Sequence, residues 1–222
     1  MLKNISFFRL QPIVKISNGK VLNYGHEVLV NLSHIKSDEL EDYFSNLSLF
    51  HYRNLFKLQL SLFSRFDGHF FINAPVEIFL SDFKFDTLFL NAKSNIKNNI
   101  SIEIQDADVL LTLSDVDLSI VRKKILMLQN HGVNVWLDDA DDRFLGVAIY
   151  LSVHGIKIDK TIVWSVDDLS YISEAYSNVG VSVLAEGIES IFHFNKLIPA
   201  NIYFAQGYFW PEIHLDLHGK LY

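Results

Sequence analysis

The chain has 222 residues and no cysteine, and its 19 Lys and Arg against 26 Asp and Glu give a formal net charge of −7. This length suits one domain with a single large core and is short for two enzyme domains, so we expect one domain over residues 1–222. A negative surface repels nucleic acid and anionic lipids. The lack of cysteine excludes disulfides and thiolate metal sites. Without a signal peptide or an apolar membrane span, we expect a cytoplasmic protein that contacts neither membrane nor nucleic acid directly.

Short β-branched or aromatic runs alternate along the chain with longer stretches of helical periodicity. The runs predict strands over residues 7–14, 20–30, 69–73, 100–104, 133–137, 155–158, 181–185 and 201–204. The stretches between them predict helices over residues 39–66, 110–130, 144–153, 167–179 and 189–197. This alternation indicates parallel pairing and an α/β fold. A compact TIM-type (β/α) barrel and an open, doubly wound sheet are both compatible with it.

Polar side chains lie in or directly after most of the predicted strands. They are Glu27, Asn73, Glu103, Asp138, Asp139, Lys157 and Glu186. One such acid alone would more often face solvent, but parallel strands bring their carboxyl ends to one face. Clustered carboxylates need a positive charge to balance them, and oxygen ligands suit Mg²⁺, Mn²⁺ or Ca²⁺. The set therefore predicts a divalent-metal site, in which the adjacent aspartates could bridge two ions and the lysine could hold a water or a phosphate oxygen.

The same residues belong to a series of motifs that resembles the EAL domain family, the cyclic di-GMP phosphodiesterase module of bacteria. In chain order the motifs are Gln11-Pro12-Ile13-Val14, Glu27-Val28-Leu29, Ile72-Asn73, Glu103-Ile104-Gln105-Asp106, Asp138-Asp139, Lys157-Ile158-Asp159, Ala185-Glu186-Gly187-Ile188-Glu189 and Gln206-Gly207-Tyr208. The resemblance covers nearly the whole chain. It implies a modified TIM-type barrel whose first strand is antiparallel, with the site at the carboxyl ends of the strands.

The resemblance also implies a role for each of these residues. The implied metal ligands, for Mg²⁺ or Mn²⁺, are Glu27, Asn73, Glu103, Asp138, Asp139 and Glu186. The implied catalytic residues are Lys157, which would orient the hydrolytic water, and Glu186. The implied substrate-binding residues are Gln11, Leu29, Asn31 and Gln206. The reaction that this set implies is hydrolysis of cyclic di-GMP to linear pGpG.

Several positions depart from the family pattern. Active relatives usually carry an arginine that grips a substrate phosphate where this chain has Asn31, and a neutral amide cannot replace a bidentate cation. The loop after the paired aspartates lacks both usual glycines, and Asp141 and Asp142 add repulsion toward an anionic substrate. The second acid of the Glu-x-x-Glu segment is shortened to Asp106. Metal ligation could survive these changes while capture of the substrate fails.

The departures favour a degenerate EAL-like protein, without efficient hydrolysis, that regulates by binding another protein. Stand-alone degenerate members in enterobacteria include anti-flagellar factors that bind the FlhD subunit of the flagellar master regulator FlhD/FlhC. This resemblance makes FlhD a candidate partner and repression of flagellar gene expression a candidate role. The alternatives are an active phosphodiesterase with two divalent metals and a protein that binds cyclic di-GMP without cleaving it.

Overall fold

The computed structural model describes residues 4–33, 35–36, 39–85, 100–217 and 220. Its strands are β1 (Ile5–Ser17), β2 (Lys20–Leu32), β3 (Phe70–Pro75), β4 (Ile100–Gln105), β5 (Asn134–Ala140), β6 (Gly155–Ile158), β7 (Ser182–Ala185), β8 (Phe204–Gln206) and β9 (Ile213–Leu215). Neighbouring strands from β2 to β8 are parallel, and β1 pairs antiparallel with both β8 and β2. These two pairings close β1–β8 into a barrel. The predicted barrel with an antiparallel first strand is therefore confirmed, and the open sheet is excluded.

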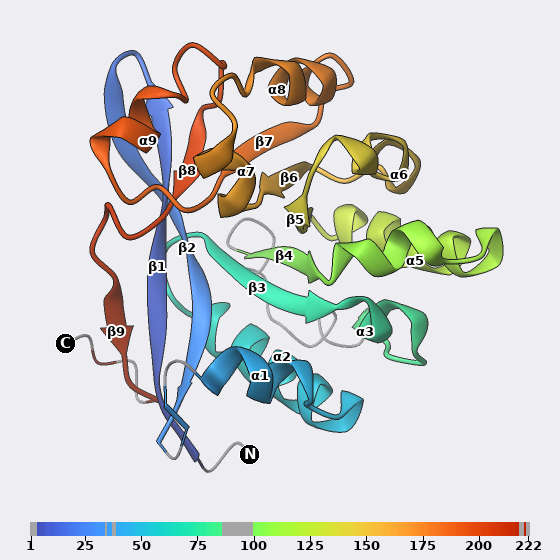
Figure 1. Cartoon of the computed structure of the whole chain (residues 1–222). Coiled ribbons are helices and arrows are strands. Elements are labelled where there is room, and N and C mark those ends of the chain that lie inside the picture. The colour runs from blue at the N-terminus through green and yellow to red at the C-terminus, as the bar shows by residue number, and fades with distance from the viewer. Residues whose placement is uncertain (1–3, 34, 37–38, 86–99, 218–219, 221–222) are drawn as a thin grey trace.

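Helices surround the barrel on its outside (Figure 1). The α-helices are α1 (Leu40–Ser45), α2 (Leu49–Phe63), α3 (Val76–Leu80), α5 (Asp115–Asn130), α6 (Leu145–Leu151), α7 (Lys160–Ser165), α8 (Ser170–Ser177) and α9 (Ile191–Asn195), and two 3₁₀ turns cover Ala107–Thr112 and Asp142–Phe144. Among the described residues, no helix is both long enough and apolar enough to cross a membrane.

Several element boundaries differ from the sequence predictions. The predicted helix over 39–66 is two helices, because Ser48 has an extended backbone between them. The predicted helix over 110–130 begins at Asp115, because the Ser114 side chain accepts the Asp117 backbone N–H and caps the helix there. The last barrel strand covers 204–206 instead of 201–204, and α3, α7 and β9 were not predicted.

Apolar side chains fill the interior of the barrel below its carboxyl-terminal mouth. This apolar plug consists of Ile13, Phe71, Trp136 and Leu184, with Tyr24 and Phe204 packed against it. Trp136 takes the largest share of the space because its neighbour on β6 is Gly155. A Cβ on Gly155 would lie 2.2 Å from the indole carbon Cζ3. The barrel is thus packed at this level, and the carboxyl ends of its strands lie above the plug.

Candidate active site

The polar residues predicted at the strand ends lie one layer above the apolar plug. Because side chains alternate along a strand, the position two residues beyond each plug residue faces the same interior. Along β5 and directly after β7 these positions are Asp138 and Glu186, and β2 and β4 add Glu27 and Glu103. These four acids are called the carboxylate ring below. Glu103 is fully buried, although it carries a carboxyl group.

Lys157 of β6 stands at the centre of the carboxylate ring and is 1% exposed. Its Nζ lies 2.7 Å from Glu186 Oε1 and 3.1 Å from Asp138 Oδ1. The same nitrogen lies 3.2 Å from Glu103 Oε1 and 3.3 Å from Glu27 Oε2. A single cation therefore contacts four acids, and the charges of this layer do not balance unless protons or further cations are bound.

Two amide side chains fix the orientation of Glu27. Asn73 Nδ2 donates to Glu27 Oε1 at 2.7 Å, and Gln206 Nε2 donates to Glu27 Oε2 at 2.5 Å. Gln206 Nε2 also lies 2.7 Å from Gln11 Oε1, so β8 is tied to β1 at the same level. These contacts hold the Glu27 carboxylate between Asn73 on β3 and Gln206 on β8.

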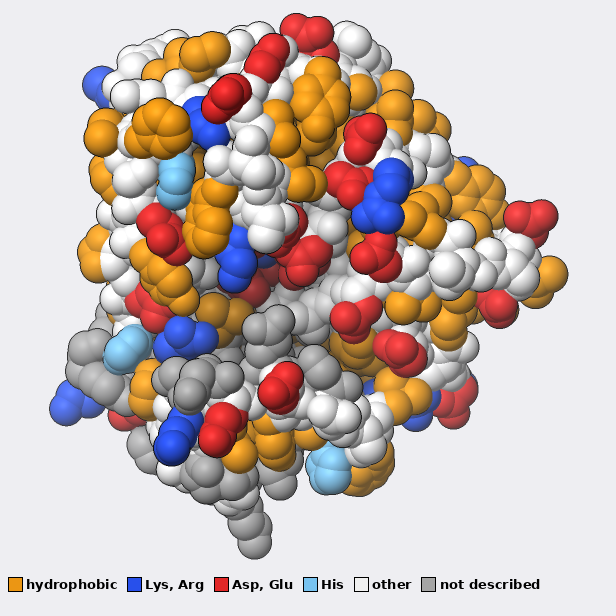
Figure 2. Space-filling model, viewed as in Figure 1, with side chains coloured by type: hydrophobic (Ala, Val, Ile, Leu, Met, Phe, Trp, Pro, Cys, Tyr) orange, Lys and Arg blue, Asp and Glu red, His pale blue; other side chains and the backbone are white. Residues whose placement is uncertain are grey.

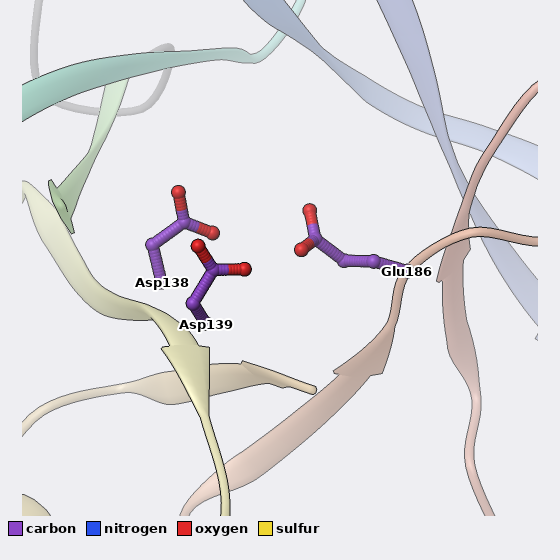
Figure 3. Close-up of side chains that lie close together, drawn as sticks. All are labelled: Asp138, Asp139 and Glu186. Atoms are coloured by element: carbon purple, nitrogen blue, oxygen red, sulfur yellow. The ribbon is translucent and has the colours of Figure 1, made fainter. Parts of the chain in front are cut away.

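The paired aspartates owe their position to an irregularity in β5. The pairing of β5 with β6 is regular through Leu137 and resumes at Ala140, which leaves Asp138 and Asp139 in a bulge. Asp139 has φ +48°, a left-handed conformation that aspartate tolerates better than most residues. Carboxylate oxygens of Asp138, Asp139 and Glu186 all lie within 4.8 Å of one another. Figure 3 shows the two aspartates of β5 pointing across the mouth toward Glu186, which follows β7.

Burial and uncompensated charge shift the pKa values of these acids. Burial alone would raise the pKa of Glu27, but Lys157 and the two amide hydrogen bonds outweigh it and lower that pKa. Burial raises the pKa of Glu103 well above its ordinary value, and neighbouring carboxylates add to the rise. Burial likewise raises the pKa of Glu186 to about 8 and, together with the charge of Asp138, that of Asp139 to about 7. At neutral pH the carboxylate ring therefore retains protons that a divalent cation could displace.

The donor atoms left free in this layer suit a hard divalent cation. Among the described residues, Asn73 Oδ1 is buried and accepts no hydrogen bond, and Glu103 Oε2 accepts none either, while Glu103 Oε1 contacts the Lys157 ammonium at 3.2 Å. Unsatisfied buried oxygens are costly, and Mg²⁺, Mn²⁺ and Ca²⁺ take oxygen ligands of these kinds. Acidic side chains also gather around the middle of the face drawn in Figure 2. The residues present thus fit one cation beside Glu27, Asn73 and Glu103 and a second beside Asp138, Asp139 and Glu186.

The residues predicted to bind substrate lie on β1, β2 and β8, within this layer or next to it. Gln11 is hydrogen-bonded to Gln206 within it. Leu29 and Asn31 follow Glu27 on the same face of β2, and both are half-buried. The Asn31 side chain is already in use, because its Nδ2 donates to Ser6 Oγ at 3.0 Å. The structure brings the predicted residues to one mouth of the barrel, while their individual roles stay predictions.

The sequence matches the family model of the EAL domain over residues 2–212. The chain belongs to the EAL domain family. No curated protein sequence matches it.

Solved EAL structures share the fold of this EAL domain. A stand-alone EAL protein from Vibrio cholerae O395, solved with c-di-GMP bound, has a TM-score of 0.72 and 18% identity over 94% of this chain and 92% of its own. Bd1971, an EAL enzyme solved with cAMP and cyclic di-GMP, has a TM-score of 0.71 and 19% identity over 93% of this chain. YkuI of Bacillus subtilis, solved with c-di-GMP and calcium, has a TM-score of 0.68 and 20% identity over 91% of this chain. The present chain spans only 61% of the Bd1971 chain and 53% of the YkuI chain.

Proposed function

We propose that this EAL domain hydrolyses cyclic di-GMP to linear pGpG, slowly, with divalent cations bound at the carboxylate ring. The observation that carries the proposal is the complete layer of acids and amides around Lys157, in which, among the described residues, the buried oxygens Asn73 Oδ1 and Glu103 Oε2 accept no hydrogen bond. Such a layer is expensive to fold, since each buried charge must be desolvated. A protein that only docks onto a partner has no need of it. In keeping with a chain that lacks cysteine, we place this activity in the cytoplasm.

The residues of the site divide the chemical work. Bound Mg²⁺ or Mn²⁺ would neutralise the phosphodiester and acidify the attacking water. Lys157 Nζ, with three N–H donors and four acids within 3.3 Å, would hold and orient that water once cations occupy the acids. The water oxygen bonds to phosphorus and releases a proton, the bond from phosphorus to the 3′ oxygen breaks, and that oxygen takes up a proton, so no proton is gained or lost overall. Glu186, 2.7 Å from Lys157 Nζ, lies beside the position proposed for this water.

We expect slow hydrolysis because of the residue at position 31 of β2, beside the site. Asn31 is neutral and its amide already donates to Ser6. It therefore offers no charge to a substrate phosphate, whereas an arginine would offer two parallel N–H donors. We expect the loss to weaken substrate capture rather than to remove the metal ligands.

The test is an assay for pGpG after incubation of the full chain with cyclic di-GMP and Mg²⁺ or Mn²⁺. We expect slow turnover in the wild type and at least a hundredfold loss in Glu27→Gln, which keeps the shape of the side chain and removes a ligand charge. Glu174→Gln, an exposed position on α8, is the matched control and should turn over like the wild type. Absence of pGpG at high enzyme concentration, or unchanged turnover in Glu27→Gln, would refute the proposal.

The second candidate is regulation by binding a protein, with the FlhD subunit of FlhD/FlhC as the named partner and flagellar repression as the role. A specific observation favours it: apolar side chains stand exposed on α9 and after β8, among them Phe192 at 64% and Tyr208 at 66%. Exposed apolar side chains of this size are typical of docking surfaces. Calorimetry with FlhD tests the partner, with Phe192→Ser as the variant that should weaken binding. If calorimetry detects no binding at tens of micromolar, FlhD is excluded as the partner.

A further inference from the structure

The strands β1 and β2 continue past the carboxylate ring and form a wall beside the mouth of the barrel. Along both strands, alternate residues are buried against the helices, and the residues between them are half-exposed. The half-exposed residues beyond Gln11 and Glu27 are Phe7, Arg9, Leu29 and Asn31. These four residues are called the outer wall below. They lie on the face of the strands that also carries Gln11 and Glu27, because side chains alternate with a period of two.

Arg9 is the cation of the outer wall, and its hydrogen-bonding capacity is largely unused. It lies opposite Leu29 on β2 and opposite His214 on β9. Its Nη1 is 3.5 Å from Glu212 Oε1, with side chains 25% and 15% exposed. Arg9 Nε and Glu212 Oε1 are both buried and have no hydrogen-bond partner among the residues that the structure describes. A guanidinium has five N–H donors in a fork that matches phosphate, and a loose pair with one carboxylate leaves most of them free.

Cyclic di-GMP carries two phosphates, and the mouth offers them different surroundings. The phosphate that is cleaved must lie at the carboxylate ring, where the cations bind. The other phosphate then lies further out, where Leu29 is apolar and Asn31 is engaged with Ser6. Arg9 stands two residues beyond Gln11, about 7 Å along the strand, so its backbone is at this outer level, and its guanidinium lies beside Glu212.

We propose that Arg9 binds the uncleaved phosphate of cyclic di-GMP, and that Glu212 holds Arg9 in a loose ion pair until the nucleotide replaces it. This inference rests on the proposed function, because it assigns a phosphate-binding residue to the same substrate. Arg9 on β1 would thus supply the positive charge that Asn31 on β2 lacks. It also makes Glu212 a competitor of the substrate.

Equilibrium titration of the full chain with cyclic di-GMP in Ca²⁺ tests the assignment, since YkuI was captured with its substrate in that ion. We expect Arg9→Gln to weaken binding about ten- to hundredfold, as for loss of a charged hydrogen bond, and Arg9→Lys to recover part of the affinity. Glu212→Gln should tighten binding roughly two- to fivefold, because it releases Arg9 from an ion pair. In the double variant that gain should vanish. Arg65→Gln, exposed at the opposite end of the barrel, should bind like the wild type.

The outcomes separate the two proposals. If the wild type binds and Arg9→Gln binds equally well, the role of Arg9 is wrong and the proposed function stands. If the wild type does not bind cyclic di-GMP at all, both are wrong. Should Arg9→Gln fail to fold, Glu212→Gln decides alone, because unchanged or weaker binding in that variant contradicts the competition.

Discussion

Replacing Lys157 by methionine removes the single cation that four acids share. Methionine keeps the length of the side chain and leaves Glu27, Glu103, Asp138 and Glu186 facing one another. Removing one partner of a buried ion pair costs about 3–5 kcal/mol. In a chain of 222 residues, each kcal/mol lowers the melting temperature by about 2–4 °C. We therefore expect Lys157→Met to melt roughly 6–20 °C below the wild type in metal-free buffer at pH 8.

Added metal should reverse much of this loss, because divalent cations supply the missing positive charge. A ligand at a hundredfold its Kd stabilises the folded state by about 2.7 kcal/mol, and the variant should gain more than the wild type, in which Lys157 competes for the same oxygens. Urea denaturation with and without Mg²⁺ measures both effects, and Lys123→Met on the exposed face of α5 is the matched control. A loss below 1 kcal/mol without metal, or an equal loss with and without Mg²⁺, would refute the account of Lys157 as the counter-ion of the carboxylate ring.

Three further predictions concern pH, packing and capping. The pKa of Glu186 is raised to about 8 from the ordinary 4.5, so between these pH values the folded chain holds a proton that the unfolded chain releases. The metal-free free energy of unfolding should therefore fall as pH rises from 4.5 to 8. The affinity for Mg²⁺, measured by calorimetry, should rise over the same range, because binding of the cation releases that proton. Gly155→Ala should destabilise by at least 2 kcal/mol in urea denaturation, because the new methyl meets Trp136 at 2.2 Å; a melt within 0.5 kcal/mol of wild type would contradict it. Ser114→Ala should cost about 1 kcal/mol by loss of the cap on Asp117 N–H, and Ser119→Ala, in the interior of the same helix, is the comparison variant.

Regular features of the sequence predict the α/β fold and the membership of the carboxylate ring, whereas the choice of a barrel over an open sheet rests on the resemblance to the EAL family. A period of two along each strand fixes which residues share a face, and parallel strands bring their ends together. Asp138 and Glu186 could be placed at one mouth on that basis. The bulge that turns Asp139 toward them could not, because it depends on how β5 and β6 pair.

Short elements and cross-strand partners are harder to predict than long periodic ones. The three-residue strand β9 is stabilised by pairing with β1, and nothing in its own residues marks it. Helix α7 has only six residues and begins at the Asp159 cap. Arg9 could have been noticed, since it precedes Gln11 by two residues and so shares its face, but its contact with Glu212 joins residues 203 positions apart in the chain, the difference 212 − 9. Such a contact becomes visible only when the chain is folded.

Because the apolar plug closes the barrel from below, the carboxylate ring is accessible only from the carboxyl-terminal mouth. Ile13, Phe71, Trp136 and Leu184 fill the barrel below the carboxylate ring, so any ion or nucleotide that binds at the ring would have to enter and leave at the same mouth. Glu103 belongs to the carboxylate ring directly above the plug, and Arg9 belongs to the outer wall beyond the ring. A nucleotide bound between Glu103 and Arg9 would cover the carboxylate ring. On the proposed function, the cations would therefore bind before the nucleotide, and the product would have to leave before either cation could exchange.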